Sequence, residues 1–383
     1  KEVGSDRLDR VVRLRARGQD PFMKSSFKEN QGIGIQPGKS YQDKREICND
    51  NFVSLVGQGK AALFSLDGLQ KKGEMQSVHV NHTMWTEKQG SNGRGRVCLD
   101  PARPNEASSY NGQVNKEDHD AHYPPMDLPS VHDIATMAVN QRAKYPNVTL
   151  CGATVDTSAA YTQTTQSVTT AKWHTTLAQF VQVTGAVITL VLFYLCGIFG
   201  DTRAGHVYCS CAQIIHDQHN AGLEHDRSRT YIDDGIFIDH PMHIRGSVRY
   251  YRFLVETLFG PGSVNDSKVH VWAGQLLAIG WHFDFVKWTV MPKPKGLAKL
   301  VVALFDDIKL GQTKTDRTTM KKITGLLSWY GAVIPAGRSF VASLFACGEG
   351  AHSRQQNPVV HLTALALSDL QWWRALLLVA FHA

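Results

Sequence analysis

Three aspartates stand where their carboxylates could hold a divalent cation. Asp156 ends the apolar run TLCGATVD, and Asp233 and Asp234 lie between the apolar halves of RTYIDDGIFID. Carboxylates beside side chains such as Val155 and Ile236 are costly to keep charged unless a positive group lies between them. Mg²⁺ meets that need because it prefers hard oxygen ligands, and two such ions about 4 Å apart can activate a hydroxyl and stabilise a leaving oxygen. These residues therefore favour the phosphoryl-transfer chemistry of polymerases and nucleases.

The elements that would position the aspartates are a helix, a strand and a hairpin. Ser130, followed three residues later by Asp133, has the spacing of a capping box and predicts a helix that starts at Val131. The run TLCGATVD predicts a buried strand that ends at Asp156, and RTYIDDGIFID predicts two strands that meet at residues 233–235. Taken alone, Asp-Asp-Gly also fits an ordinary turn with two solvated acids, because Asp-Gly favours turns in any protein.

The rest of the chain predicts further strands and then helices. The run GAVITLVLFYLCGIFG at 185–200 is shorter than the about 18 apolar residues of a membrane span and is rich in β-branched residues, so we expect strands and no membrane partner. In LLAIGWHFDFVKWTVMP, alternation predicts one face made of Trp281, Phe283, Phe285 and Lys287. Helical stripes follow, made of Ile323, Leu326, Leu327 and Tyr330 and, after Pro335, of Val341, Leu344 and Phe345.

Composition describes an ordinary globular chain with a basic balance. The 383 residues are 43% hydrophobic and 20% charged, and 41 Lys and Arg against 34 Asp and Glu give a net charge of +7, which favours polyanionic partners. Seven scattered cysteines, without a signal peptide ahead of them, predict reduced thiols in an intracellular compartment, cytoplasmic or nuclear. Cys209-x-Cys211 with His206, His216 and His219 has ligand types but not the usual zinc spacing, so we expect no zinc site there.

A series of sequence blocks resembles reverse transcriptases. Tyr231-Ile232-Asp233-Asp234 resembles their YxDD box, and further blocks follow the family's order along the chain. RVCLDPARPN resembles the fingers block through Arg96, Asp100 and Asn105, TVDTSAAY the first palm block through Asp156 and Tyr161, and FGDTRAGHVY the template-binding block through Phe199, Gly200 and Tyr208. VNDSKVHVWAGQLLAIGWHF resembles the family's motif of a Lys ahead of an apolar-Gly-aromatic strand, with Lys268 and Gly280 in those places. KWTVMP resembles the hairpin that grips the primer end, and MKKITGLLSWYGAVIPAGRSF resembles the start of the thumb. LSDLQWWRALL resembles the connector that precedes a ribonuclease H domain.

The variant of the family that the chain resembles is that of retrotransposons. The template-binding block opens with Phe199-Gly200, where the commonest retroviral enzymes have a polar pair. In this respect the chain resembles the enzymes of tyrosine-recombinase, DIRS-type elements or of related LTR elements. The template-binding block has Ala204-Gly205 where the family has Ser-Pro or Ala-Pro. In the fingers block, Arg103 lies one residue later than the corresponding arginine of the family. These departures keep an alternative open, in which the chain is a catalytically decayed remnant that only binds nucleic acid. Another palm-type polymerase, one that makes RNA, is the second alternative.

The resemblance implies an α+β, right-hand polymerase fold with fingers, an antiparallel-sheet palm backed by helices, and a helical thumb. It divides the chain into fingers at 86–124 and 164–199, palm at 125–163 and 200–292 including the primer-grip hairpin, and thumb with the start of the connector at 293–383. Residues 1–85 form an N-terminal region to which we assign no role. The chain would be one piece of a retroelement polyprotein, next to a ribonuclease H domain.

The resemblance also implies a function and its residues. The chain would be an RNA-directed DNA polymerase core, a nucleotidyltransferase that adds deoxynucleoside triphosphates to a primer 3′-end on an RNA or DNA template, with two Mg²⁺ ions or Mn²⁺ in their place. Asp156 and Asp233 would bridge the ions, with Asp234 and the Thr157 carbonyl in support, and Lys268 would protonate pyrophosphate. The nucleotide would be bound by Lys88, Arg94, Arg96, Tyr161, Phe199 and Gly200, with Tyr161 excluding a 2′-hydroxyl. The primer and template would contact Tyr231, Trp288 and Met291.

Overall fold

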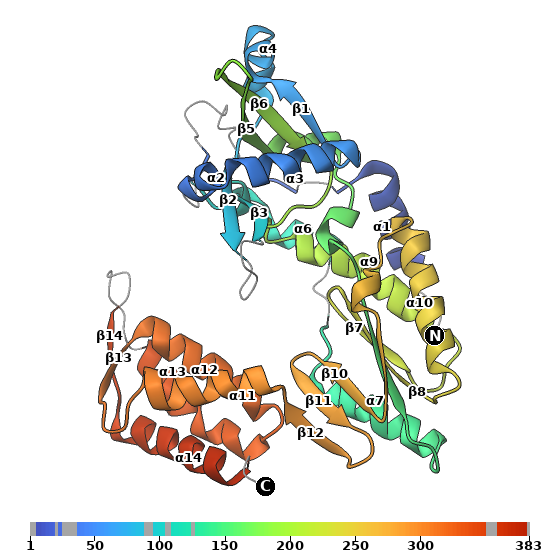
Figure 1. Cartoon of the computed structure of the whole chain (residues 1–383), viewed down its shortest axis with the longest axis vertical. Coiled ribbons are helices and arrows are strands. Elements are labelled where there is room, and N and C mark those ends of the chain that lie inside the picture. The colour runs from blue at the N-terminus through green and yellow to red at the C-terminus, as the bar shows by residue number, and fades with distance from the viewer. Residues whose placement is uncertain are drawn as a thin grey trace.

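The computed structural model describes residues 5–19, 22–24, 37–87, 95–103, 109–123, 127–349 and 358–380. Figure 1 shows an N-terminal part with its own sheet at the top, a central sheet flanked by helices below it, and a C-terminal group of helices at the lower left, beside the central sheet. The described part of the chain has no helix with both the length and the apolar character that crossing a membrane requires.

The upper part is built on an antiparallel sheet with the order β1-β6-β5. Its strands are β1 (Ala61–Ser65), β5 (Thr175–Val181) and β6 (Val187–Tyr194), and Ala61 lies opposite Tyr194. The apolar run at 185–200 is thus largely a strand, as expected. The helical elements of this part are α2 (Lys39–Asp43), α3 (Arg45–Gly57), α4 (Leu66–Lys71), η1 (Glu74–Ser77) and α8 (Val168–Trp173).

Between the upper part and the central sheet lies a two-stranded sheet of β2 (His82–Glu87) and β3 (Gly95–Asp100). Strand β2 continues across the division that we placed between residues 85 and 86, because its partner β3 pairs with it along its whole length. Three helices follow in or near this part of the structure: α5 (Tyr110–Gln113), α6 (Lys116–His122) and α1 (Ser5–Arg17), of which α1 packs on the helix α9 (Ala204–His219).

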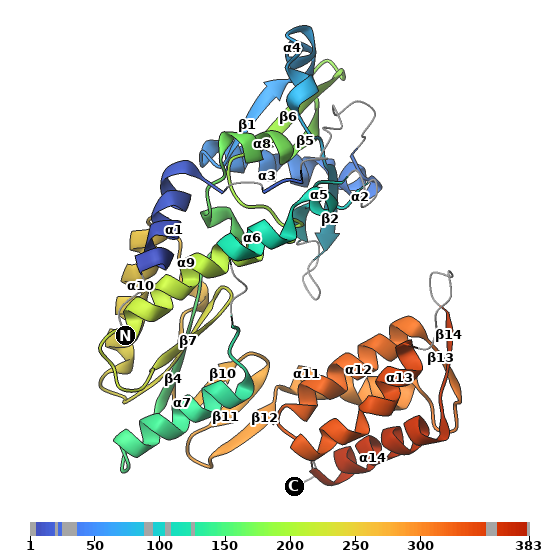
Figure 2. The ribbon, with the colours of Figure 1, turned by 180° about the vertical axis from the view of Figure 1, so that it is seen from behind.

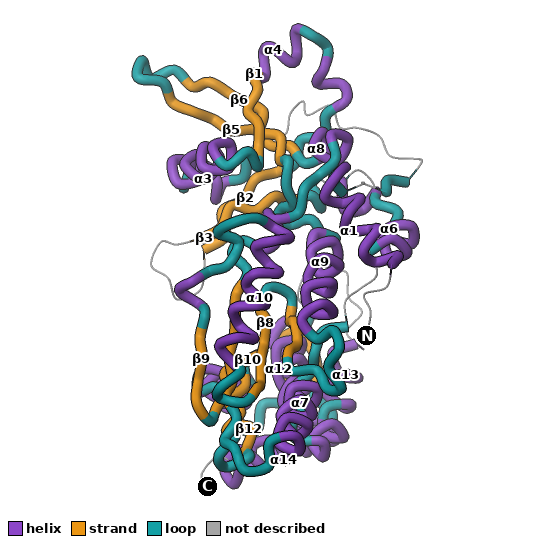
Figure 3. The backbone as a smooth tube through the Cα atoms, turned by 90° about the vertical axis from the view of Figure 1, so that its right-hand side faces the viewer, coloured by secondary structure: helices purple, strands orange, loops and turns teal. Residues whose placement is uncertain are grey.

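The central sheet has the order β7-β8-β4-β9 and is covered on both faces. It consists of β4 (Cys151–Asp156), β7 (Ser228–Tyr231), β8 (Asp234–Asp239) and β9 (His270–Ala273). On β8, Ile236 and Ile238 pack toward α7 (Val131–Lys144), whereas Phe237 packs toward α9 (Ala204–His219) and α10 (Ile244–Phe259), as the two-residue period of a strand requires. Figure 3 shows α9 and α10 side by side along this sheet. The predicted capping box of Ser130 and Asp133 opens α7.

A three-stranded sheet connects the central sheet to the C-terminal helices. Its strands are β10 (Gln275–Ala278), β11 (Trp281–Asp284) and β12 (Thr289–Pro292), and the short helix η3 (Asp266–Lys268) precedes β9. Trp281, Phe283 and Phe285 of the predicted face are all buried. The predicted alternation is wrong at Lys287, which lies in an exposed turn because Asp284 accepts the backbone N–H groups of residues 286 and 287 and ends β11.

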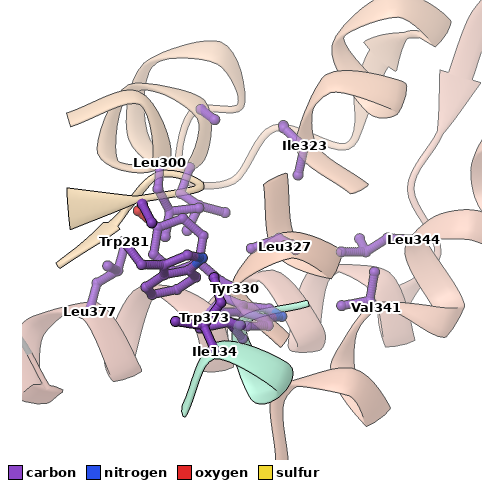
Figure 4. Close-up of a cluster of buried hydrophobic side chains, with 14 of the residues drawn as sticks. Ile134, Trp281, Leu300, Ile323, Leu327, Tyr330, Val341, Leu344, Trp373 and Leu377 are labelled. Atoms are coloured by element: carbon purple, nitrogen blue, oxygen red, sulfur yellow. The ribbon is translucent and has the colours of Figure 1, made fainter. Parts of the chain in front are cut away.

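The C-terminal part packs against that sheet through one continuous apolar core. Its elements are α11 (Pro294–Val302), the π-helix η4 (Ala303–Asp307), β13 (Lys314–Asp316), α12 (Arg317–Gly331), η5 (Pro335–Phe340), α13 (Ala342–Glu349), β14 (Val359–His361) and α14 (Ala364–Ala380). Figure 4 shows Trp281 from β11 and Ile134 from α7 among side chains of these helices. Trp281 stacks on Trp329 with ring centroids 4.2 Å apart. The predicted second stripe is wrong at Phe345, which is 45% exposed.

Candidate active site

The three aspartates come together at one end of the central sheet. Strands β4 and β8 pair with Asp156 directly opposite Asp234, and the Thr157 N–H donates to the Asp233 carbonyl at 2.8 Å. Facing residues of an antiparallel pair point to the same side of the sheet, so these two carboxylates share one face. Residues far apart in the sequence are therefore joined by main-chain hydrogen bonds.

The hairpin that carries Asp233 turns at residues 232–233, slightly earlier than the predicted 233–235. Tyr231 pairs with Asp234, so the turn consists of Ile232 and Asp233, and Asp234 is the first residue of β8. Ile232 has a φ of 53°, a left-handed conformation that is unfavourable for a β-branched residue. Such strain persists where the surroundings enforce it, and both residues of this turn line the same cavity.

The electrostatics of the site favour a cation. Asp156 is only 7% exposed. Burial, with Asp233 and Asp156 as neighbouring carboxylates, raises the pKa of Asp234 to about 6, and burial together with Asp156 also raises the pKa of Asp233. The Lys268 ammonium offsets part of this, since its Nζ lies 2.6 Å from Asp156 Oδ1. Carboxylate oxygens that repel one another in a partly buried place fit the hard oxygen ligands of Mg²⁺.

Two cavities meet at Asp156 and Lys268, which line both of them. One, of about 230 Å³, is also lined by Arg96, Tyr161, Phe199 and Asp233. The other, of about 390 Å³, is also lined by Asp234, Trp272, Gly280 and Lys293. We call them the Tyr161 cavity and the Trp272 cavity. Asp156 and Lys268 thus stand at the border between two recesses of the surface.

Aromatic rings and a guanidinium form the wall of the Tyr161 cavity. The ring centroids of Tyr161 and Phe199 are 5.2 Å apart, and the guanidinium carbon of Arg96 lies 4.9 Å from the Phe199 centroid. Gly200 does not line this cavity, yet it has a φ of 111° and packs against the Leu99 carbonyl, where a side chain would clash. Lys88, Arg94 and Asn105 lie outside the described residues.

Three predicted contact residues lie apart from both cavities. Tyr231 packs partly buried against the apolar core, on β7. Trp288 and Met291 are 42% and 43% exposed on the β11–β12 hairpin, and the guanidinium carbon of Arg142 lies 5.7 Å from the Trp288 ring centroid. The structure therefore gathers Asp156, Thr157, Asp233, Lys268, Arg96, Tyr161 and Phe199 around one cavity and leaves these three outside it.

Two residues at the site were missed in the sequence. Asn265 lines the Tyr161 cavity, and its backbone N–H donates to the Asp156 carbonyl at 2.9 Å. Lys293 lines the Trp272 cavity and helps lower the raised pKa of Asp234. The basic run around Lys293, KPK, was a usable signal. Asn265 had none, because its place depends on the bridge between Thr157 and Val264.

Comparison with known proteins gives a fold and no sequence family. No protein-family model matches the chain, and no curated protein sequence matches it. A foamy viral protease-reverse transcriptase, dRH, in complex with double-stranded DNA is similar over 98% of this chain and 58% of its own, at a TM-score of 0.54 and 11% identity. The foamy viral protease-reverse transcriptase in complex with an RNA/DNA hybrid is similar over 99% of this chain and 44% of its own, at a TM-score of 0.52 and 12% identity. The chain spans about half the length of these structures, and its overall fold is similar to theirs.

Proposed function

We propose that this chain is the core of an RNA-directed DNA polymerase that adds deoxynucleotides to a primer 3′-end. The observation that carries the proposal is the position of Asp156 at the border between two cavities. A polymerase must bring two substrates together at one acidic centre, the incoming nucleotide from one side and the primer end from the other. The Tyr161 cavity suits the nucleotide and the Trp272 cavity the primer end.

The acidic centre would hold the metal ions. Asp156 and Asp233 would bind both Mg²⁺ ions, or Mn²⁺ in their place, with Asp234 and the Thr157 carbonyl beside them. When bound, such ions activate the primer hydroxyl and stabilise the leaving oxygen. Lys268 is within reach of the same oxygens, since it contacts Asp156 Oδ1, and its ammonium can supply a proton to the departing pyrophosphate.

The residues of the Tyr161 cavity would select and hold the nucleotide. Arg96 presents its guanidinium there, and with Lys88 and Arg94 it would bind the triphosphate through charge-assisted hydrogen bonds. The ring of Tyr161 would lie under the sugar, where a 2′-hydroxyl would collide with it. Phe199 would contact the base, and Gly200 lets the backbone approach the template closely.

The remaining parts would hold the primer and template. In this proposal the upper part corresponds to fingers, the central sheet to the palm and the C-terminal helices to the thumb. Tyr231, Trp288 and Met291 would contact the primer strand. The parent protein would be a retroelement polyprotein of DIRS or related LTR type, with an adjoining ribonuclease H domain, that acts in the cytoplasm or nucleus.

Primer extension tests the proposal. The chain is mixed with a DNA primer on an RNA template, deoxynucleoside triphosphates and Mg²⁺, and Asp233→Asn is compared with Asp67→Asn, an exposed carboxylate on α4. We expect Asp233→Asn to lower the extension rate about 10³-fold, which is about 4 kcal/mol of transition-state stabilisation, and Asp67→Asn to leave it unchanged. Binding of primer-template should survive both changes.

Two results would contradict the proposal. A wild-type chain that binds primer-template with the salt dependence of phosphate contacts, yet incorporates nothing with Mg²⁺ or Mn²⁺, would establish the nucleic-acid-binding remnant instead. A chain that extends equally well with ribonucleotides would establish an RNA-making polymerase.

A further inference from the structure

Two histidines and an aspartate from different helices meet away from the acidic centre. His119 and Asp120 lie on α6, and His206 lies in the first turn of α9. Their ligand atoms, one from each residue, all lie within 4.8 Å of one another, and the rings of the two histidines are 5.8 Å apart. Figure 2 shows α6 and α9 as neighbours. Within the described residues, no other three His, Cys, Asp or Glu side chains place one ligand atom each this close together.

The spacing of these atoms is close to that of a tetrahedral metal site. The Nδ1 atoms of His119 and His206 lie 3.3 Å and 3.4 Å from the same oxygen, Oδ1 of Asp120. Zinc bonds of about 2.0–2.2 Å at tetrahedral angles separate neighbouring ligand atoms by about 3.3 Å. Two of the three separations therefore already have the value that a bound ion would impose.

One ligand atom of the trio is left unsatisfied by the protein. The buried His206 Nδ1 has no hydrogen-bond partner although it faces the Asp120 carboxylate. Buried polar atoms without partners are costly, and a bound ion is one way to satisfy them. Asp120 and His206 keep 27% and 33% of their side chains exposed, which leaves a path for an ion and a place for a water ligand.

We propose that His119, Asp120 and His206 form a structural binding site for a divalent transition-metal ion of the zinc class. Two imidazole nitrogens and one carboxylate oxygen suit Zn²⁺, whereas Mg²⁺ prefers oxygen ligands alone. The ion would join α6 to α9, the helix that begins four residues after Gly200. The site does not include Cys209 or Cys211, which are buried thiols on the same helix. The proposal stands independently of the polymerase activity.

Metal titration of the full chain tests the site. The chelator-treated chain is titrated with Zn²⁺ by calorimetry and with Co²⁺ by visible absorption, in the presence of excess Mg²⁺ to occupy oxygen-only sites. We expect one tightly bound Zn²⁺ that raises the melting temperature, and a Co²⁺ spectrum with d–d bands but no thiolate charge-transfer band. His206→Gln and Asp120→Asn should each weaken Zn²⁺ binding about tenfold or more. His225→Gln, another exposed histidine, should bind like the wild type.

The side chains altered in His206→Gln and Asp120→Asn are both partly exposed, so we expect both variants to fold. The melting temperature of each variant without metal checks that it does. Failure of the wild-type chain to take up Zn²⁺ overturns the proposal. Unchanged uptake in His206→Gln and Asp120→Asn also overturns it, and so does a thiolate band, which would place the ion on cysteines.

Discussion

The central sheet and the upper sheet are both antiparallel, but they are covered differently. Helices and the β10–β12 sheet bury both faces of the central sheet, and five of the six residues of β8 are buried. The upper sheet leaves apolar side chains in solvent, with Phe64 49% and Val187 53% exposed. The aspartates therefore lie on the more deeply buried sheet. This difference predicts that damage to the upper sheet stays local, whereas chemistry depends on the central one.

The largest effect should come from opening a cavity in the upper sheet. Leu192 on β6 is fully buried, so Leu192→Ala should lower the local free energy of unfolding by about 2–5 kcal/mol. Hydrogen exchange measured by mass spectrometry should rise in β1 and β5 and stay unchanged in β4 and β8. Val181→Ala, at a 52% exposed position of the same sheet, should change stability by less than about 0.5 kcal/mol. Equal acceleration in β4 and β8 would show that the two sheets unfold as one unit.

A smaller effect is expected where the two regions meet. Tyr161 lies in η2 (Ala160–Gln163), just past the end of β4, and its ring packs on Phe199. Tyr161→Ala should raise incorporation of ribonucleotides relative to deoxynucleotides by about 10- to 100-fold, because the ring that would meet the 2′-hydroxyl is gone. Tyr161→Phe keeps the ring and should keep the discrimination. The ratio of kcat/KM values for the two nucleotides is the measurement, and an unchanged ratio in Tyr161→Ala would place the selecting group elsewhere.

The smallest effect concerns pH and the charge on the central sheet. The pKa of Asp234 is raised to about 6, so the folded chain binds this proton more tightly than the unfolded chain does. The protonated Asp234 therefore contributes to the free energy of unfolding. This contribution is complete below the ordinary carboxyl pKa and is lost as the pH rises through about 6. Without Mg²⁺, Asp234→Asn should therefore be more stable than the wild type at neutral pH, by on the order of 1 kcal/mol, and no more stable at a pH of about 4.

Urea denaturation in a chelating buffer measures this difference at both pH values. Added Mg²⁺ should stabilise the wild type more than Asp234→Asn at neutral pH, because the ion removes the repulsion that the substitution also removes. A wild type that is the more stable of the two at neutral pH without Mg²⁺ would contradict the raised pKa.

Sequence reasoning identified the central sheet better than the upper one for a physical reason. A strand buried on both faces, such as β8, has a nearly continuous apolar sequence, and the cap of α7 is a local signal within four residues. Strand β1 has no comparable signal, because its apolar character fades toward solvent and its partner β6 lies far along the chain. Likewise, the convergence of Asp156 and Asp233 could be inferred from motif order, whereas Asn265 and the trio at His119 depend on tertiary placement alone. The names fingers, palm and thumb remain predictions.

The contact of Lys268 with Asp156 has a consequence for how the site is assembled. The tethered ammonium of Lys268 neutralises part of the acidic pocket without any metal ion. In the proposed function, an entering ion would therefore have to compete with a cation that the chain itself supplies. Because half of the Lys268 side chain is exposed, it would have room to swing aside if such an ion bound.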